Sequence, residues 1–137
     1  MSFRPVLVPA DPRQPGVWDT VRDYLEAALV RGAEKDWDLK GLRWAIESDA
    51  LRLFVFVKGS RIFGAGVSSE IVYPKRKVLE IILMSCDPGH EEDWKQVFGQ
   101  FMSLARGNGF SAIVGTGRPG WARKLGANER RVFEVDL

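Results

Sequence analysis

The chain has 137 residues, of which 45% are hydrophobic and 28% charged, and this size supports one domain with a real core over residues 1–137. The net charge of +2 is too small to indicate a nucleic-acid partner, and no apolar run approaches the roughly 20 residues of a membrane span. One cysteine excludes an internal disulfide, and the N-terminus has no basic-then-apolar leader, so we expect a cytoplasmic protein.

The first third of the chain predicts one strand and two helices. Residues 3–8 are apolar and β-branched, which favours a strand, and three prolines hold the following loop extended. Apolar residues at helical spacing then run from Val17 to Leu29, with Gly32 as the C-cap. Asp38 is suited to cap a second helix, over residues 39–48, although Gly41 inside it costs roughly 1 kcal/mol against Ala.

Two antiparallel strands come next. Residues 51–58 and 62–72 are strand-like, and the turn Lys58-Gly59-Ser60-Arg61 between them is typical of a hairpin. Gly64 and Gly66 weaken the second strand, so we expect it to bend or bulge there.

The stretch from Lys77 to Arg106 is the most informative part of the chain. Residues 78–86 form an apolar run bounded by turn residues, which predicts a strand buried on both faces. Residues 91–106 carry one apolar stripe and predict a helix, so the next strand, residues 110–116, should lie parallel to the first. Because open α/β sheets bind ligands beyond the carboxyl ends of their strands, a small-molecule site should border residues 84–94.

The end of the chain predicts a short helix and one more strand. Residues 118–125 favour a helix stopped by Gly126. In the last segment, residues 130–137, we expect Phe133, Val135 and Leu137 to alternate inward from a strand. The predicted order is therefore β-α-α-β-β-β-α-β-α-β.

This order and the segment Gly120-Trp121-Ala122-Arg123-Lys124-Leu125-Gly126-Ala127 carry a family resemblance. The chain resembles the GNAT acyltransferases (Gcn5-related N-acetyltransferases) over its whole length, with Gly126 in the glycine place of their closing helix-to-strand signature. The resemblance implies a single α/β (α+β) domain with a mixed central sheet of about six to seven strands, flanked by about four helices. Residues 117–125 and 132–137 look closer still to small GNAT-like proteins encoded by tailed phages and prophages.

The resemblance implies acetyl-CoA as the cofactor and an amine as the substrate. In the family, the pantetheine arm pairs with the strand matched by residues 78–86, and the pyrophosphate lies on amides of the loop that opens the long helix. The cofactor-binding candidates are Met84, Ser85, Cys86, Gly89 and His90 at the matching positions, together with Arg118 and Arg123 on the short helix that family members place beside the cofactor. Lys124, beside Arg123, is a further cation that could reach a ligand phosphate.

Glu80 is the candidate catalytic base. It lies on the matched strand, in phase with Met84 and Cys86, and is flanked by apolar residues. The structural alternative is that Glu80 lies near the start of the strand and reaches solvent, or pairs with Arg76 or Lys77.

The junction between strand and helix departs from the family's phosphate-loop pattern, Arg/Gln-x-x-Gly-x-Gly/Ala. It holds only one glycine, Pro88 lacks an amide donor, and Asp87 is suited to cap the helix itself. Negative charges at residues 91–93 would stabilise the helix and repel a pyrophosphate. The tyrosine that serves as an acid in the family aligns with Ala122, and no tyrosine follows Tyr73.

Three hypotheses therefore stand for the function. The first is an acetyl-CoA-dependent N-acetyltransferase of unknown acceptor. The second is a catalytically inactive GNAT-fold protein that does not bind CoA and serves as a phage or prophage structural or interaction module. In the third, the same cleft holds a different ligand. Five tryptophans favour a protein partner or a homodimer.

Two other motifs, the Cys86–His90 pair and a glycine-rich turn, favour a structural role over a catalytic or binding role. Cys86 and His90 are suited to a thiolate–imidazole pair only if the thiol pKa is low, and the acidic neighbours oppose that. With Asp87 and Asp93 they match no closed zinc set, so we expect no metal site. The glycines at 115, 117 and 120 are spaced like a dinucleotide-binding fingerprint. The remaining residues leave little room for the strand and the ribose-binding acid that follow such a fingerprint, so we expect a tight turn.

Overall fold

The structure is a computed structural model that describes residues 3–32, 34–116, 121–130 and 133–137. The described strands form one mixed sheet with the spatial order β1-β2-β3-β4-β5, in which β1 to β4 are antiparallel and β5 is parallel to β4. The strands are β1 (Pro5–Ala10), β2 (Arg52–Lys58), β3 (Arg61–Val72), β4 (Lys77–Cys86) and β5 (Ala112–Gly115). The helices are α1 (Val17–Arg31), α2 (Leu39–Glu47), α3 (Glu91–Gly107) and α4 (Trp121–Leu125).

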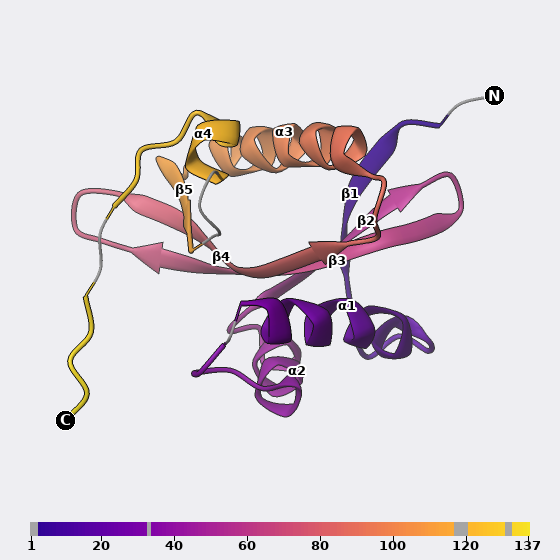
Figure 1. Cartoon of the computed structure of the whole chain (residues 1–137), viewed down its shortest axis with the longest axis horizontal. Coiled ribbons are helices and arrows are strands. Elements are labelled where there is room, and N and C mark those ends of the chain that lie inside the picture. Colours follow the sequence, from indigo (N-terminus) through magenta and orange to yellow (C-terminus); the bar gives the residue numbers. More distant parts are fainter. Residues whose placement is uncertain (1–2, 33, 117–120, 131–132) are drawn as a thin grey trace.

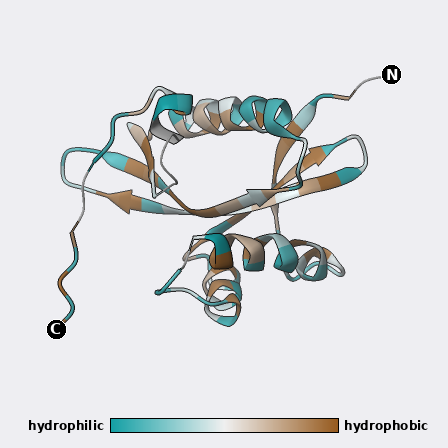
Figure 2. Cartoon of the chain, viewed as in Figure 1, coloured by the Kyte–Doolittle hydropathy of each residue, from teal (hydrophilic) through white to brown (hydrophobic). Residues whose placement is uncertain are grey.

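The sheet lies between two layers of helices. Figure 1 shows α1 and α2 on one face and α3 with α4 on the other, while Figure 2 shows hydrophobic segments along the strands between these layers. No helix in the ranges that the structure describes is long and apolar enough to cross a bilayer.

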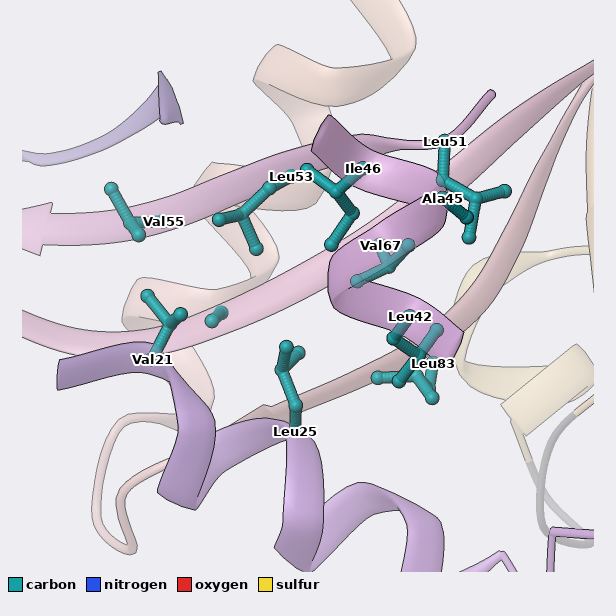
Figure 3. Close-up of a cluster of buried hydrophobic side chains, with 11 residues drawn as sticks. Val21, Leu25, Leu42, Ala45, Ile46, Leu51, Leu53, Val55, Val67 and Leu83 are labelled. Atoms are coloured by element: carbon teal, nitrogen blue, oxygen red, sulfur yellow. The ribbon is translucent and has the colours of Figure 1, made fainter. Parts of the chain in front are cut away.

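The larger core fills the space between the sheet and helices α1 and α2. Val21 and Leu25 of α1 and Leu42 of α2 are fully buried there against strand residues such as Val67 (Figure 3). These helix residues recur at the three- and four-residue spacing of an amphipathic stripe. The predicted cap of α2 is confirmed, because the Asp38 carboxylate accepts a hydrogen bond from Gly41 N at 2.7 Å.

Helix α3 packs on the other face through the predicted apolar stripe. Phe101 meets Phe54 of β2 edge to face, with ring centroids 5.3 Å apart. Gln100 fixes the helix to β1, because its side chain accepts a hydrogen bond from Leu7 N at 2.9 Å and donates one to Pro5 O at 2.7 Å. The polar bridge and the aromatic contact together hold α3 across the sheet.

Gly64 of β3 lies beside the predicted bulge and also allows a close approach of neighbouring strands. A Cβ on Gly64 would lie 2.6 Å from Phe56 Cδ2 and 2.6 Å from Ser85 O, so this position requires the close approach of neighbouring strands. The irregularity in the β2–β3 register falls next to it, where Phe56 pairs with Gly64 and Val57 with Ile62. The expected bulge is therefore present, one residue before Gly64.

The predicted final strand is the main correction to the fold. Among the described residues of the last segment none is in a strand, and the side chains of Phe133, Val135 and Leu137 are exposed rather than turned inward. A strand needs a partner for its backbone hydrogen bonds, and alternation in the sequence does not supply one. The described sheet thus has five strands, fewer than the family resemblance implied.

Candidate functional site

Strands β4 and β5 pair along only part of their length. The parallel ladder runs from Val78–Ala112 to Ile81–Gly115 and then stops, while β4 continues to Cys86 (Figure 1). Residues 83–86 pair with β3 on the other side. Within the part of the chain that the structure describes, no strand pairs with the β5-facing edge of residues 82–86. This edge can therefore offer backbone hydrogen bonds to an extended ligand.

The register of β3 and β4 places a bulge where the β4–β5 ladder stops. Val67 pairs with Leu83, whereas the next residue, Ser68, pairs with Ile81, so Ile82 is an extra residue on β4. A bulge of this kind bends the strand and reverses the alternation of the side chains that follow it. The bend at Ile82 thus accompanies the separation of the two parallel strands.

The bulge separates Glu80 from the cofactor-binding candidates. Leu79 and Ile81 contact the core beneath α3, so Glu80 between them points to the opposite face of the sheet. After the bulge, Met84 and Cys86 again lie beneath α3. The prediction that Glu80 is in phase with these two residues is wrong, because it assumed an uninterrupted strand.

Glu80 is half-buried and bonded to the neighbouring strand. Its Oε1 accepts a hydrogen bond from Ser69 Oγ at 3.2 Å, and the two residues are cross-strand partners. Among the described residues Glu80 forms no ion pair with Arg76 or Lys77. Its role as a general base stays a prediction.

The side chains at the end of β4 are held from both faces. Met84 Sδ accepts a hydrogen bond from Trp94 Nε1 at 3.4 Å, beneath α3. Ser85 Oγ donates to the carbonyl of Tyr24 at 2.9 Å on the α1 face, so this hydroxyl is already engaged. Burial raises the pKa of the Cys86 thiol, and the charges of Asp87 and Glu91 raise it further. The thiol is therefore protonated at neutral pH and unsuited to be a nucleophile.

The first turn of α3 is organised around Asp93. His90 precedes the helix as the N-cap residue, stacks on Phe63 at a centroid distance of 4.5 Å, and places Nδ1 2.8 Å from Asp93 Oδ2. Lys58 Nζ lies 3.1 Å from both carboxylate oxygens of Asp93. These hydrogen bonds, first from His90 and then from Lys58, lower the pKa of Asp93. Its negative charge is thus compensated by two neighbours.

Asp87 does not cap α3, contrary to the prediction, because a residue of α1 binds it. The hydroxyl of Tyr24 donates to Asp87 Oδ2 at 2.9 Å, and the backbone N–H of Asp87 donates to Phe63 O at 2.7 Å. Burial raises the pKa of Tyr24 to about 12, with a further contribution from Asp87. The phenol is therefore a neutral donor, and among the described residues no side chain caps the first turn of α3.

Sequence reasoning missed Tyr24. It lies in the apolar stripe of α1, 63 residues before Asp87, and was unremarkable there. The one available signal was its chemistry, since a tyrosine on a buried stripe brings a hydroxyl that usually finds a polar partner.

Helix α4 brings two cations near the end of β4. Leu125 packs against the cluster that contains Trp94 and Phe63, while Arg123 and Lys124 are exposed. Arg118, the other predicted cation, lies outside the described residues. Glu91 and Glu92 are exposed at the first turn of α3, and Gly89 before it adopts a φ of +84°. The described residues contain no cluster of three or more metal-ligating side chains.

Neither a protein-family model nor a curated protein matches the sequence. Solved structures do match. An aminoglycoside acetyltransferase from an uncultured soil metagenomic sample, solved in complex with sisomicin, has a TM-score of 0.71 and 15% identity over 97% of this chain and 96% of that chain. An acetyltransferase of Trypanosoma brucei has a TM-score of 0.62 and 18% identity over 97% of this chain and 99% of that chain. A predicted acetyltransferase of Clostridium acetobutylicum, solved with acetyl-CoA, has a TM-score of 0.69 and 13% identity over 97% of this chain and 96% of that chain. At these identities the likeness is one of fold.

Proposed function

We propose that this chain, which has the fold of GNAT acetyltransferases, is an acetyl-CoA-dependent N-acetyltransferase that acts on an amine. The observation that carries the proposal is the edge of β4 over residues 82–86, with which no described strand pairs, from the bulge to the junction with α3. One structural neighbour that shares this fold was solved with acetyl-CoA, which supports the cofactor.

The residues around this edge fit an acyl-CoA. A pantetheine arm carries amide groups, and an unpaired strand edge presents the complementary backbone donors and acceptors. The uncapped first turn of α3 suits phosphate oxygens, because helix amides and the helix dipole both favour an anion there. Arg123 and Lys124 add positive charge from α4, whereas Glu91 and Glu92 oppose binding.

Bound acetyl-CoA supplies an activated acyl group, and the chain supplies the environment for transfer. Glu80, which lies on the opposite face of β4 from Met84, would take the proton of the attacking amine through a water molecule. A backbone amide near Met84 or Ser85 would stabilise the negative charge that develops on the acyl oxygen during transfer. Because burial and the neighbouring charges raise the pKa of the Cys86 thiol, this cysteine would not serve as an acyl carrier.

A second candidate function rests on the exposed carboxylates and the C-terminal segment. In this reading the chain is a GNAT-fold interaction module of a phage or prophage that does not bind CoA. Glu91 and Glu92 would repel phosphates, and Phe133 and Val135 would contact a partner protein. The two readings differ in one measurable property, which is CoA binding.

Calorimetry with CoA and acetyl-CoA, at low and moderate salt, separates them. Saturable binding with one site per chain is expected, and Arg123→Ala should weaken it. Glu91→Gln should tighten it by about two- to fivefold, because one repulsive charge at the helix N-terminus is worth about 0.3–1 kcal/mol. Glu26→Gln, an exposed substitution on α1, is the matched control and should change nothing.

Activity is then tested with a panel of amines. Glu80→Gln should lower turnover by about 10²-fold or more with CoA affinity unchanged. An absence of heat at ligand concentrations near 1 mM would correspond to less than roughly 4 kcal/mol of binding and would leave the interaction module as the function.

A further inference from the structure

The segment at residues 133–137 has the pattern of a strand but forms no strand pair with the described part of the chain. Its apolar residues Phe133, Val135 and Leu137 alternate with two acidic residues. All three apolar side chains are exposed, Phe133 at 92% and Val135 at 73%. Figure 1 shows the segment, in yellow, apart from the sheet and from both layers of helices. Three large apolar side chains on one face gain stability only when another surface covers them.

Strand β5 offers an edge of the kind that this segment needs. It is the last strand of the described sheet, and β4 is the only described strand that pairs with it. Ile113 of β5 packs with Phe101 and Phe110 beneath α3, so the apolar core reaches this edge. The strand has four residues, which matches the length of the segment. Open strand edges accept a further strand because their backbone N–H and C=O groups lack partners.

Helix α3 leaves an apolar side chain exposed on the side that faces β5. Gln100 bonds Leu7 and Pro5 of β1, which fixes the side of α3 that faces the first strand of the sheet. Met102 follows two residues later, about 200° around the helix, and is 41% exposed. It therefore lies on the side away from β1 and towards β5, where a strand added to β5 would extend the sheet beneath it.

The charges near this edge are complementary to those of the segment. The two acidic residues of the segment lie on the face opposite its apolar side chains. Lys75 and Arg76, in the turn between β3 and β4, are exposed and form no ion pair with any described residue. This turn lies beside the start of β5, because Ser111 N donates to the carbonyl of Lys77 at 2.8 Å. A strand added to β5 therefore brings acidic side chains towards two cations.

We propose that residues 133–137 of one copy add as a strand to the β5 edge of a second copy, in a closed dimer in which each chain receives the segment of the other. The apolar face of the segment then covers the end of the core beside Ile113 and Met102, while its acidic face meets the basic turn. Within one copy the open edge and the exposed segment lie apart (Figure 1), and a twofold exchange pairs both of them in both chains.

Sedimentation velocity on the full chain, over a range of concentrations and without any CoA, measures the association. We expect a reversible equilibrium between a monomer and a dimer. Amide hydrogen exchange, followed by mass spectrometry, then locates the contact. Residues 112–115 and 133–137 should exchange at least about tenfold more slowly in the dimer than in the monomer, because pairing of the two strands protects both sets of amides.

Two substitutions in the segment test its role. Val135→Pro removes a backbone donor from the added strand, and Phe133→Ser removes its largest apolar side chain. Each should weaken the dimer at least about tenfold. Both side chains are exposed in a single copy, so the circular dichroism spectrum of the monomer should not change. The matched control is Val30→Ser, at a valine on α1 that is 75% exposed, and it should leave the association unchanged.

Charge reversal tests whether the two copies exchange their segments. One variant combines Lys75→Glu with Arg76→Glu, and the other combines Glu134→Lys with Asp136→Lys. Each alone should weaken its dimer by about fivefold or more, since like charges then meet. An equimolar mixture of the two variants should restore the parent affinity, because every turn in the mixed dimer then faces a segment of opposite charge.

Three results would overturn the proposal. The first is a monomer at all concentrations up to about 100 µM. The second is a dimer that Val135→Pro and Phe133→Ser leave unchanged, since the copies would then meet elsewhere. The third is slow exchange of residues 133–137 in a monomer, which would show that the segment returns to β5 of its own chain. Because no sample contains CoA, each result is independent of the acetyltransferase proposal.

Discussion

Gly64→Ala should destabilise the fold by about 2 kcal/mol, because the strands leave no room for a methyl group. The new Cβ would lie 2.6 Å from Phe56 Cδ2, 2.6 Å from Ser85 O and 2.7 Å from Cys86 Cβ. Ordinary contacts lie near 3.5 Å, so each of these is short by close to 1 Å. Phe56 is 2% exposed and Ser85 O belongs to the neighbouring strand, so neither atom can move freely.

The magnitude follows from two opposing effects. Overpacking of this kind costs up to about 3 kcal/mol, and the loss of glycine freedom in the unfolded chain returns roughly 0.4–1 kcal/mol. The net loss of about 2 kcal/mol should lower the melting temperature by roughly 8 °C. Urea denaturation, followed by tryptophan fluorescence, measures the change as a shift in midpoint at constant slope.

Gly66→Ala is the matched control on the same strand and the same face. Its added Cβ would have its nearest contacts at 3.4 Å to Leu83 O and 3.5 Å to Met84 Cβ, which are ordinary distances. Its stability should therefore stay the same or rise by up to about 1 kcal/mol. Equal effects of the two substitutions, or a Gly64→Ala variant as stable as the parent, would refute the close approach of β3 and β4 at Gly64.

Three further predictions concern the contacts around α3. Asp93→Asn should flatten the acid limb of the plot of stability against pH. The pKa of Asp93 is lowered in the folded protein, so its carboxylate adds stability above the unfolded pKa of about 3.9, and that stability is lost as the pH falls through the folded pKa. The denaturation midpoints of parent and variant should therefore converge in acid. A constant difference at all pH values would contradict it. Gln100→Ala should cost about 1–2 kcal/mol in urea, since two hydrogen bonds to β1 are lost, and a neutral result would exclude the bridge. Ultraviolet titration should show one phenol that ionises near pH 12, and Tyr24→Phe should remove this ionisation. Because the pKa of Tyr24 is raised above its unfolded value of about 10, the neutral phenol contributes stability below pH 10 that is lost as the pH rises through about 12. Retention of that titration in the variant would assign it to the other tyrosine.

Local sequence patterns correctly predicted the helices that bury one apolar face against the sheet. The stripes of α1 and α3 and the cap at Asp38 follow from spacing and from backbone hydrogen bonding within a few residues, and the structure confirms them. The parallel pairing of β4 with β5 also followed, because a strand and an amphipathic helix form half of a crossover. These features depend on information that lies within one segment of sequence.

Features that depend on contacts between distant segments could not be predicted in the same way. The bulge at Ile82 is set by the register of two strands, and it moved Glu80 to the other face of the sheet. The bond from Tyr24 to Asp87 depends on how α1 lies against the end of β4. The alternation of Phe133 and Val135 looked like a strand, but a strand exists only where another strand offers its edge.

The same contacts change how the acidic junction before α3 should be judged. Counted from sequence, its carboxylates form one block of negative charge facing any phosphate. In the structure, Asp87 accepts the Tyr24 hydroxyl and Asp93 is held by Lys58 and His90, so these two charges face protein donors. The exposed pair Glu91 and Glu92 remains, and solvent and salt screen exposed charges most strongly. Because compensated and screened charges repel an anion only weakly, the obstacle to acyl-CoA binding is smaller than the sequence implied, and the affinity should depend on ionic strength more than on the shape of the loop.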